Sequence, residues 1–541
     1  MNSRPTWWEE LRVDIPFADQ PAVYILTLAV LVFFARAFGD QKSNLPELNP
    51  KKAFEFTNRR RVSEFFPRSA ALLAEGRSRF GNKLYKAYCD WGEVIVLSPQ
   101  HIEELRSDAR LSFLVPANDV YHIFTMMPVI DTVAHMDSQD THGYIPGFDA
   151  FSLDDKLAKI VTKYLTKALT KLTAPISQEA TFAMRAVLTD SPEWHVMSPK
   201  EDLVRVVSQM STRIFMGEEL CRNEEWTKAS GDYTITAFKA TDKVRAWPRL
   251  LRPIVHWAMP VCQDLRQQLV KANNALEPHI KKRNAIKAAA LAKGQPSPFD
   301  DLVEWWETEY GPSNEHARHQ LTLTVVAIHT TSDLLQQTMI DIAMNPEILA
   351  PLREEVITVL GSQGLKKTAL YNLKLMDSVI KESQRMKPAL LGLWSRQALA
   401  DVELSDGFVI KKGQRVLGEG THMWNSEYWK DADKFDGYRF LRLREAAEGE
   451  RDEDSKTAHL VSTSSRHLGF GHGIHACPGR FFAANEIKIA LCHILLKYDW
   501  KLPDGFQPKA TTFGMSIIPD PATKFLIRRR KEELDLDSLE C

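Results

Sequence analysis

Apolar residues recur at intervals of three and four over most of the chain, which is the spacing of one helix face. The pattern is longest in Asp154–Ala174 and Glu315–Met344. The second stretch predicts a helix of about 30 residues, roughly 45 Å long, that ends at Asn345-Pro346. Strand-like runs are few and short: EVIVLS near Val94, DVELSDGFVI over Val402–Ile410, and KFLIRR near the carboxyl end. The pattern predicts a mainly α protein with small β-sheets.

The amino-terminal segment has a different pattern, with no charge from Gln20 to Ala35. A helix crosses a bilayer with roughly 20 apolar residues, about 17 at the least, and residues 21–38 reach that limit if Arg36 extends to the surface. We expect a lumenal or interfacial segment over 1–20, with Trp7 and Trp8 at the membrane surface. A membrane anchor helix over 21–38 and a Pro-containing hinge over 39–50 follow. The alternative is a cleaved signal peptide, but no Ala-x-Ala-like site is present.

Residues 51–541 contain no Gly/Ser- or Pro-rich linker and favour one large domain. The chain of 541 residues is 44% hydrophobic and 26% charged, with a net charge of −1. This balance predicts a large core and excludes nucleic acid as the main partner. Six cysteines without CxxC spacing indicate neither a disulfide framework nor a zinc site. Basic residues follow the apolar segment (Lys51, Lys52, Arg59–Arg61) and place the large domain in the cytosol by the positive-inside rule.

One cysteine stands at the start of a helical pattern, in GFGHGIHACPGRFFAANEIKIAL, residues 469–491. Glycines at 469, 471, 473 and 479 allow the backbone to approach a bulky flat group or to adopt positive φ. Pro478 suits the first position of a helix. Cys477 would then lie where free N–H groups favour a thiolate, a soft ligand suited to iron. The alternative is a cysteine that caps a tight turn.

The same loop resembles the haem-binding signature of the cytochrome P450 family in Phe470, Gly473, His475, Cys477 and Gly479. The resemblance implies the cytochrome P450 fold, a single large haem-enclosing catalytic domain over 51–541. It implies that Cys477 is the axial ligand of haem b. It also implies that Phe470 packs beside the sulfur, that His475 reaches a haem propionate, and that Gly479 belongs to the cofactor-binding residues of the loop.

The resemblance extends to three charged residues outside the loop. KESQR supplies Glu382 and Arg385, which share a helix face, and FDGYRF supplies Arg439. They resemble the family's Glu-Arg-Arg cluster, whose implied role is to hold the fold around the haem loop.

The long predicted helix carries AIHTTS at 327–332. By resemblance, Thr331 is the threonine that guides protons during dioxygen activation, while Thr330 replaces an acid. Thr331, Thr330 and His329 are therefore the candidate catalytic residues. His329 and Asp333 are four residues apart and could pair as a substitute proton path. Otherwise His329 faces water or a substrate channel.

Two cations are candidates for the haem propionates. The family's Trp-x-x-x-Arg contact is not evident, and Lys163 in KIVTKYLTKAL is the nearest substitute. Arg396 in LWSRQ is the better candidate, because guanidinium matches carboxylate bidentately.

The resemblance implies substrate contacts in five segments, residues 117–127, 238–257, 325–331, 389–394 and 513–518. Their apolar content predicts a hydrophobic small-molecule substrate. ESQRMKP and LKYDWKLPDG resemble the fungal ent-kaurene oxidase and indole-diterpene branch. That branch implies a terpenoid or meroterpenoid of secondary metabolism.

No dinucleotide fingerprint is present, so the electrons must come from a separate protein. The resemblance implies a membrane-bound NADPH-cytochrome P450 reductase, with Lys488 and Arg480 as candidate contacts. It also implies dioxygen as co-substrate, contact with membrane lipid, and an endoplasmic reticulum location with a single-pass anchor.

Three functions compete at this point. The first is an NADPH- and dioxygen-dependent monooxygenase. The second is a haem-thiolate isomerase or dehydratase that needs no reductase, and the third is a non-enzymatic membrane haem binder. Dependence of product formation on NADPH separates the first from the second.

Overall fold

The computed structural model describes Thr27 and residues 45–55, 57–115, 145–151, 155–245, 247, 251–446 and 453–540. The expected anchor over 21–38, apart from Thr27, lies outside these ranges. So do residues 1–20, the first part of the hinge and the loop at 117–127. None of the helices in the described ranges combines the length and apolarity needed to cross a bilayer.

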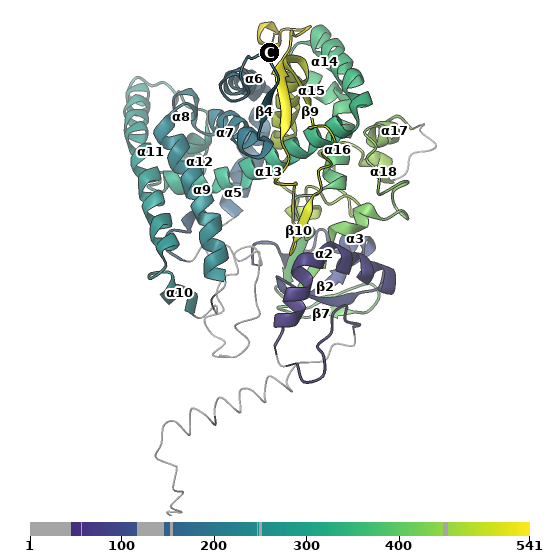
Figure 1. The fold of residues 1–541 in the computed structure, drawn as a ribbon. Helices are drawn as coiled ribbons and strands as arrows, with labels where there is room; N and C mark the ends of the chain where they lie inside the picture. The colour runs from purple at the N-terminus through teal and green to yellow at the C-terminus, as the bar shows by residue number, and fades with distance from the viewer. Residues whose placement is uncertain are drawn as a thin grey trace, which may run out of the picture.

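Helices make up most of the described chain, and the largest group of them fills the upper and left parts of the molecule (Figure 1). The predicted helix at Glu315–Met344 is confirmed as α13, His316–Met344, which ends at the cap residue Asn345. The helix predicted from Asp154 is confirmed with an interruption, since α5 (Asp155–Ile160) passes through the π-turn Val161–Leu165 into α6 (Thr166–Leu188). The other helices are α2 (Arg59–Phe80), α3 (Pro99–Leu105), α7 (Pro199–Met216), α8 (Glu218–Cys221), α9 (Glu224–Arg245), α10 (Arg252–Val255), α11 (Pro260–Ala292), α12 (Leu302–Tyr310), α14 (Leu349–Gln363), α15 (Lys367–Asn372), α16 (Lys374–Met386), α17 (Arg439–Glu445), α18 (Glu453–Lys456) and α19 (Arg480–Lys497).

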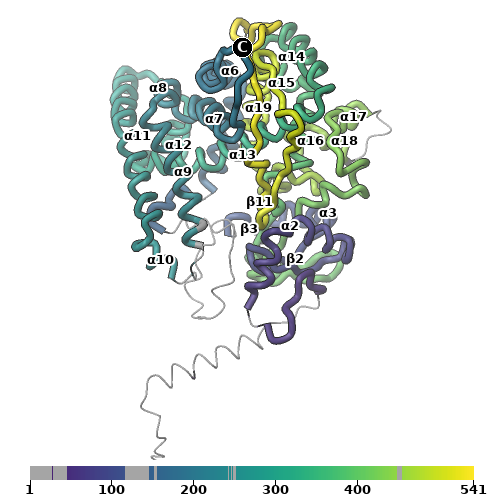
Figure 2. The backbone as a smooth tube through the Cα atoms, viewed as in Figure 1, coloured from purple at the N-terminus to yellow at the C-terminus, as the bar shows by residue number. Residues whose placement is uncertain are grey.

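The main core lies between α6, α7, α13 and α19, which contact one another. α13 runs through the middle of the molecule, with α16 beside it (Figure 2). α19 is buried on every face from Glu486 to Lys497. A helix buried all round belongs to the interior of a large protein. The residue after Cys477 therefore leads directly into the core.

A five-stranded sheet forms a second layer at the lower right, beneath α2 (Figure 1). Its order is β1 (Tyr85–Cys89), β2 (Gly92–Leu97), β8 (Arg415–Gly418), β5 (Trp394–Ala398) and β3 (Leu111–Ser112). The β2–β8 pair is parallel and the other pairs are antiparallel. The sheet brings β5, which carries Arg396, beside β3 and the residues that follow it. It packs a separate apolar cluster around Trp394.

Three smaller sheets complete the fold. The first contains β4 (His195–Met197), β12 (Phe525–Arg529) and β9 (Tyr498–Lys501), in that order. The second pairs β10 (Thr511–Phe513) with β11 (Ser516–Ile518), and the third pairs β6 (Val402–Glu403) with β7 (Val409–Ile410). All three predicted strand regions are confirmed, as β2, the β6–β7 hairpin and β12. The prediction of a mainly α protein with small β-sheets is confirmed.

Candidate haem-thiolate site

The loop before α19 holds Cys477 by backbone contacts. The N–H of Cys477 donates to the carbonyl oxygen of Phe470 over 2.8 Å, and Arg480 donates to the carbonyl oxygen of Cys477, also over 2.8 Å. The helix begins at Arg480 with Gly479 as its cap, rather than at Pro478 as the sequence suggested. Cys477 is thus held three residues before the helix, at its amino-terminal end.

Two glycines make this loop shape possible. Gly471 has φ +68° and Gly473 has φ +80°, in the region that side chains rarely adopt. A Cβ at Gly473 would lie 1.8 Å from the carbonyl oxygen of Arg106, which accepts a hydrogen bond from the N–H of Ile474. The loop is therefore pressed against the end of α3. A second contact joins the loop to α3: Nε2 of His472 lies 2.9 Å from Oε2 of Glu103. The sequence did not indicate this contact.

Burial raises the pKa of the Cys477 thiol, while the backbone N–H groups of Gly479 and Arg480 act in the opposite direction. The helix end alone therefore does not produce the expected thiolate, because desolvation opposes it. A bound metal cation reverses this balance, since a coordinating thiol is deprotonated.

The residues present fit a haem in one further respect. No group of three or more His, Cys, Asp or Glu side chains within the described ranges is placed to hold a metal ion. A haem is compatible with a single protein ligand at Cys477, because the porphyrin supplies other ligands of its iron.

Arg396 on β5 is a buried cation without an anion. It is 2% exposed, and none of the described carboxylates pairs with it. Its guanidinium donates to the carbonyl oxygen of Ser395 over 2.7 Å and lies 4.7 Å from the centre of the Trp394 ring. Burial lowers the pKa of Arg396 to about 9. A buried charge without a partner lowers the stability of the fold. A carboxylate of a ligand would provide the missing partner, so this position fits one.

His475, in the cysteine loop, lies near Arg396 on β5. Its Nε2 hydrogen-bonds the carbonyl oxygen of Leu111 over 3.2 Å, and burial, reinforced by the charge of Arg396, lowers its pKa. The rings of His475 and Phe113 are 6.3 Å apart, and the Arg396 guanidinium lies 5.5 Å from Phe113. The structure thus brings His475 and Arg396 to one place.

Lys163 lies in the π-turn Val161–Leu165, whose Val161 side chain would be 4.0 Å from a Cβ added at Gly479. Its own side chain is half exposed, and its ammonium is paired with Glu309 on α12. The hydroxyl of Tyr164 donates to the same carboxylate over 2.9 Å. The charge of Lys163 is therefore already neutralised by a protein group.

Glu382, Arg385 and Arg439 form one buried ion cluster. Arg385 donates two hydrogen bonds to the Glu382 carboxylate, each 2.8 Å, and the Nε of Arg439 lies 3.1 Å from both oxygens. The remaining donors of Arg385 reach the carbonyl oxygens of Met423 and Ala432. One helix and two later loops are joined through this carboxylate.

The same helix, α16, also supports the cysteine loop. The imidazole of His467 hydrogen-bonds the carbonyl oxygen of Lys381 over 3.3 Å. The side chain of Gln384 fills the space beside Gly469, where a Cβ would lie 2.1 Å from its Oε1. The ion cluster and the start of the loop therefore share one rigid element.

The two threonines of α13 differ in their hydrogen bonds. The hydroxyl of Thr330 donates to the carbonyl oxygens of Val326 and Ala327, at 2.9 and 3.3 Å. Thr331 is buried, and its hydroxyl makes no hydrogen bond with another described residue. The Thr331 hydroxyl therefore lacks a partner among the described residues but lies in a buried position, whereas Thr330 is exposed.

His329 does not pair with Asp333. Its ring meets Phe238 on α9 edge to face, with centroids 5.7 Å apart, and burial lowers its pKa. The carboxylate of Asp333 pairs with Lys387 at the end of α16. The suggested His329–Asp333 path is therefore wrong, because the two side chains face different neighbours.

Several of the expected substrate segments meet in space. The Phe238–His329 contact joins the segments 238–257 and 325–331. The N–H of Leu391 donates to the carbonyl oxygen of Met515 over 2.7 Å, which joins 389–394 to 513–518.

Lys488 is not placed to contact a reductase. It is 4% exposed, and its ammonium lies 2.5 Å from the Asp377 carboxylate. The prediction is wrong because α19 is an interior helix. Arg480 donates to the carbonyl oxygens of Val461 and Cys477, so its guanidinium is also engaged within the protein.

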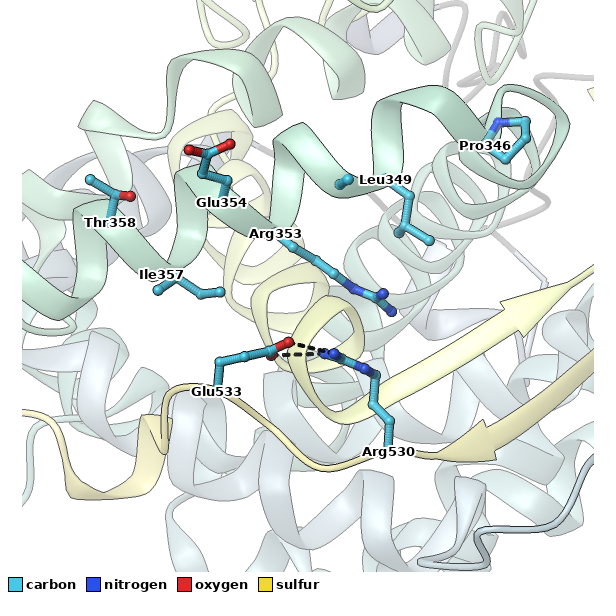
Figure 3. A pocket seen from close by; sticks show the side chains of 9 residues that line it. Pro346, Leu349, Arg353, Glu354, Ile357, Thr358, Arg530 and Glu533 are labelled. Carbon is cyan, nitrogen blue, oxygen red and sulfur yellow. Dashed lines mark hydrogen bonds and ion pairs between the residues drawn. The ribbon is translucent and has the colours of Figure 1, made fainter.

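A separate surface pocket of about 430 Å³ lies between α14 and the chain after β12 (Figure 3). Both of its arginines are paired: Arg530 with Glu533, and Arg353 with Asp499 outside the pocket, at 2.9 Å. It contains none of the residues identified from the sequence.

Known proteins resemble this chain over most of its length. The family model described as Cytochrome P450 matches residues 133–527. The cytochrome P450 monooxygenase eqxH of Fusarium heterosporum is 52% identical over 515 residues, covering 95% of this chain and 96% of that protein. The cytochrome P450 monooxygenase hepE of Aspergillus oryzae is 39% identical, covering 92% of this chain and 88% of that protein.

The fold is shared with a solved structure. The crystal structure of the cytochrome P450DA heme domain superposes with a TM-score of 0.62 at 17% identity, covering 90% of this chain and 98% of that one. The expected fold, the haem cofactor and the similarity to fungal enzymes are thereby confirmed. This chain belongs to the cytochrome P450 family and is a haem monooxygenase.

Proposed function

We propose that Cys477 is the axial ligand of the haem iron, and that the chain inserts one oxygen atom from dioxygen into a hydrophobic substrate. The observation that carries this proposal is the position of Cys477, held by the Phe470 carbonyl at the mouth of α19 in a loop that requires Gly473. When bound, the haem supplies dioxygen activation, which a thiolate ligand favours.

The other residues bind the cofactor or hold the site in shape. Arg396 receives one haem propionate, because its buried guanidinium has no carboxylate among the described residues. His475 lies beside it. Glu382, Arg385 and Arg439 hold α16 against the loop. Thr331, whose hydroxyl lacks a partner among the described residues, guides protons, whereas the Thr330 hydroxyl is committed to its own helix.

The substrate is hydrophobic, and we propose a terpenoid or meroterpenoid of fungal secondary metabolism. The proposal is supported by the apolar residues Leu390, Met515 and Phe238, which lie in expected substrate segments that each contact another such segment. Lys163 is not included among the propionate ligands, because Glu309 already neutralises it.

The membrane attachment is also a proposal. Residues 21–38 anchor the chain in the endoplasmic reticulum membrane, and residues 51–541 form the catalytic domain in the cytosol. The uncharged stretch from Gln20 to Ala35 supports this. Carbonate extraction of membranes should release a chain that lacks residues 1–44 and retain the full chain.

Two measurements test the function. The purified protein, reduced under carbon monoxide, should show the long-wavelength Soret band of thiolate ligation, and Cys477→Ser should abolish it. With a cytochrome P450 reductase and NADPH, a panel of fungal terpenoids should yield products that carry one oxygen atom from isotopically labelled dioxygen. A retained Soret band or retained turnover in Cys477→Ser would refute the role of Cys477. Product formed without NADPH would instead indicate the isomerase or dehydratase reaction.

A further inference from the structure

The expected substrate segment 389–394 lies beside the cysteine loop. At one end, the indole N–H of Trp394 donates to the carbonyl oxygen of His472 over 3.1 Å and fastens the segment to that loop. Near the other end, the N–H of Leu391 donates to the carbonyl oxygen of Met515 at the β10–β11 turn. The segment therefore runs from the cysteine loop to the second expected substrate segment.

One side of this segment is buried and the other is open. Leu391 is 0% exposed and Gly392 is also buried, whereas Leu390 and Leu393 are partly exposed. The buried side belongs to the apolar cluster beneath α2. The side chains of Leu390 and Leu393 are therefore the ones that a substrate can reach.

Trp91, in the turn between β1 and β2, lies directly behind the segment. It is 3% exposed, and a Cβ added at Gly392 would lie 2.3 Å from both Cη2 and Cζ3, at the far edge of its ring. The indole N–H group is buried and has no hydrogen-bond partner among the described residues. A buried N–H group without a partner costs stability, so the ring occupies this position through its size rather than through its polar atom.

The preceding residue of the same turn contacts the second segment. β10 lies beside α2 (Figure 1), and its turn into β11 reaches Asp90, which is 1% exposed. The N–H of Met515 donates to Oδ2 of Asp90 over 3.4 Å. Gly514 has φ +57°, and a Cβ there would lie 2.4 Å from the same oxygen. Both expected substrate segments therefore pack against the β1–β2 turn, at Gly392 and at Gly514.

We propose that Trp91 is a positioning residue of the substrate pocket. Its ring fixes how far Leu390 and Leu393 extend toward the substrate, because no space is left between the ring and the backbone of Gly392. Through the hydrogen bond to the β10–β11 turn, the ring also fixes the second segment. A substrate held by apolar contacts is oriented by the positions of those side chains. Trp91 thereby decides which carbon atom of the substrate is oxidised.

This inference rests on the proposed function, since it assumes a haem at Cys477 and a hydrophobic substrate beside it. The competing explanation is that Trp91 only fills the core. The two explanations differ in what a compensating pair of substitutions does. Gly392→Ala adds a methyl group where the Trp91 ring lies, whereas Trp91→Phe removes the far edge of that ring. The double variant Trp91→Phe/Gly392→Ala has both changes, and its methyl group takes the space that the ring leaves.

The experiment compares these three variants with wild type in the full chain with bound haem. Two ligands probe the pocket by spectral titration: imidazole, which is small enough to need only the iron, and 4-phenylimidazole, whose phenyl ring also needs space in the substrate pocket. We expect Gly392→Ala to bind 4-phenylimidazole on the order of tenfold more weakly, as one misplaced apolar contact does. Imidazole binding and the thiolate Soret band should be unchanged.

The ratio of oxygenated products is measured with reductase and NADPH on the fungal terpenoid that wild type oxidises. Gly392→Ala moves the segment toward the substrate and Trp91→Phe leaves space behind it, so each single variant should change this ratio. The double variant should regain the wild-type ratio and the wild-type affinity for 4-phenylimidazole. Such recovery reports contact between the two positions, since independent sites have additive effects.

Two matched controls place the same changes elsewhere. A Cβ at Gly437 would lie 2.1 Å from Cδ1 of Ile348, and Trp429 is 4% exposed and also has a buried indole N–H without a partner among the described residues. Gly437→Ala and Trp429→Phe should lower the melting temperature and leave 4-phenylimidazole binding and the product ratio unchanged.

The inference is overturned if Gly392→Ala keeps the wild-type affinity for 4-phenylimidazole, or if the double variant does not regain it. A wild-type product ratio in Trp91→Phe also overturns it. If the wild-type chain shows no thiolate Soret band, or makes no product with NADPH and reductase, the proposed function itself has failed.

Discussion

The carboxylate of Glu382 lies 3.1 Å from the Nε of Arg439 through both of its oxygens, across 57 residues of chain. Glu382 is fully buried, and Arg385 occupies the other side of the same carboxylate. The pair joins α16, which supports the cysteine loop, to α17. A cluster of this kind stabilises the fold only while every member is present.

Glu382→Ala should therefore destabilise the protein by about 3–5 kcal/mol, because it leaves two buried guanidiniums unpaired. Chemical unfolding measures the change. The matched control is Glu277→Gln, which removes an exposed pair with Lys281 and should change the free energy of unfolding by only about 0.3–0.5 kcal/mol. Equal effects in the two variants would show that the buried cluster has no special structural role.

Gly473→Ala should displace the cysteine loop, because its Cβ would meet the Arg106 carbonyl oxygen at 1.8 Å. We expect loss of the thiolate Soret band. Gly407 is the control, since it has φ +84° with nothing within 4 Å of a Cβ. Gly407→Ala should cost only the backbone strain, about 1–2 kcal/mol, and keep the spectrum. An intact Soret band in Gly473→Ala would contradict the proposed packing.

Arg396→Met should separate cofactor binding from folding. It removes a buried cation that has no protein anion in the described chain, so the haem-free protein should be as stable as wild type or more stable. The haem should dissociate faster, because the propionate loses its partner. Transfer of haem to apomyoglobin measures the release. Unchanged release together with a less stable haem-free protein would assign Arg396 a purely structural role.

Thr331→Ala should uncouple the reaction, so that NADPH consumption continues while product falls and hydrogen peroxide rises. Thr330→Ala should have little effect on coupling, because the Thr330 hydroxyl is bonded to the carbonyls of Val326 and Ala327. Both variants can be measured in one assay of NADPH, product and peroxide. Equal coupling in wild type and Thr331→Ala would remove Thr331 from the mechanism.

Glu486 on α19 should make stability depend on pH. Burial raises its pKa to about 8, and Ser211 donates the one hydrogen bond that its carboxyl receives from the described residues, over 2.7 Å. The folded protein holds this proton more tightly than the unfolded chain, so the contribution of Glu486 is most favourable below pH 4.5 and declines until about pH 8.

Glu486→Gln keeps the shape and removes the titration. Its stability relative to wild type should therefore increase between pH 5.5 and pH 7.5, by on the order of 2–3 kcal/mol. The difference between the two unfolding free energies at each pH isolates Glu486 from the other titrating groups. A constant difference across this range would show that Glu486 is ionised in the folded protein.

The helix α13 and the cysteine loop could be predicted from sequence, because their signals are local. Apolar spacing and Asn345-Pro346 set the length of α13, and glycine at 473 permits a backbone conformation that other residues avoid. Interactions within a few residues decide such features, so they do not depend on the rest of the fold.

Only the tertiary structure decided which charges are paired and which are free. Lys488 and Lys163 looked available, but Asp377 and Glu309 neutralise them. Asp333 forms an ion pair with Lys387 rather than with His329. The sequence by itself determined the cysteine loop, the long helix and the family, whereas the pairing and burial of the charges depended on segments far apart along the chain. The physical reason is that the residue type decides whether a side chain can carry a charge, but the free energy of that charge depends on the neighbouring groups and on its exposure to water. Folding decides both of these.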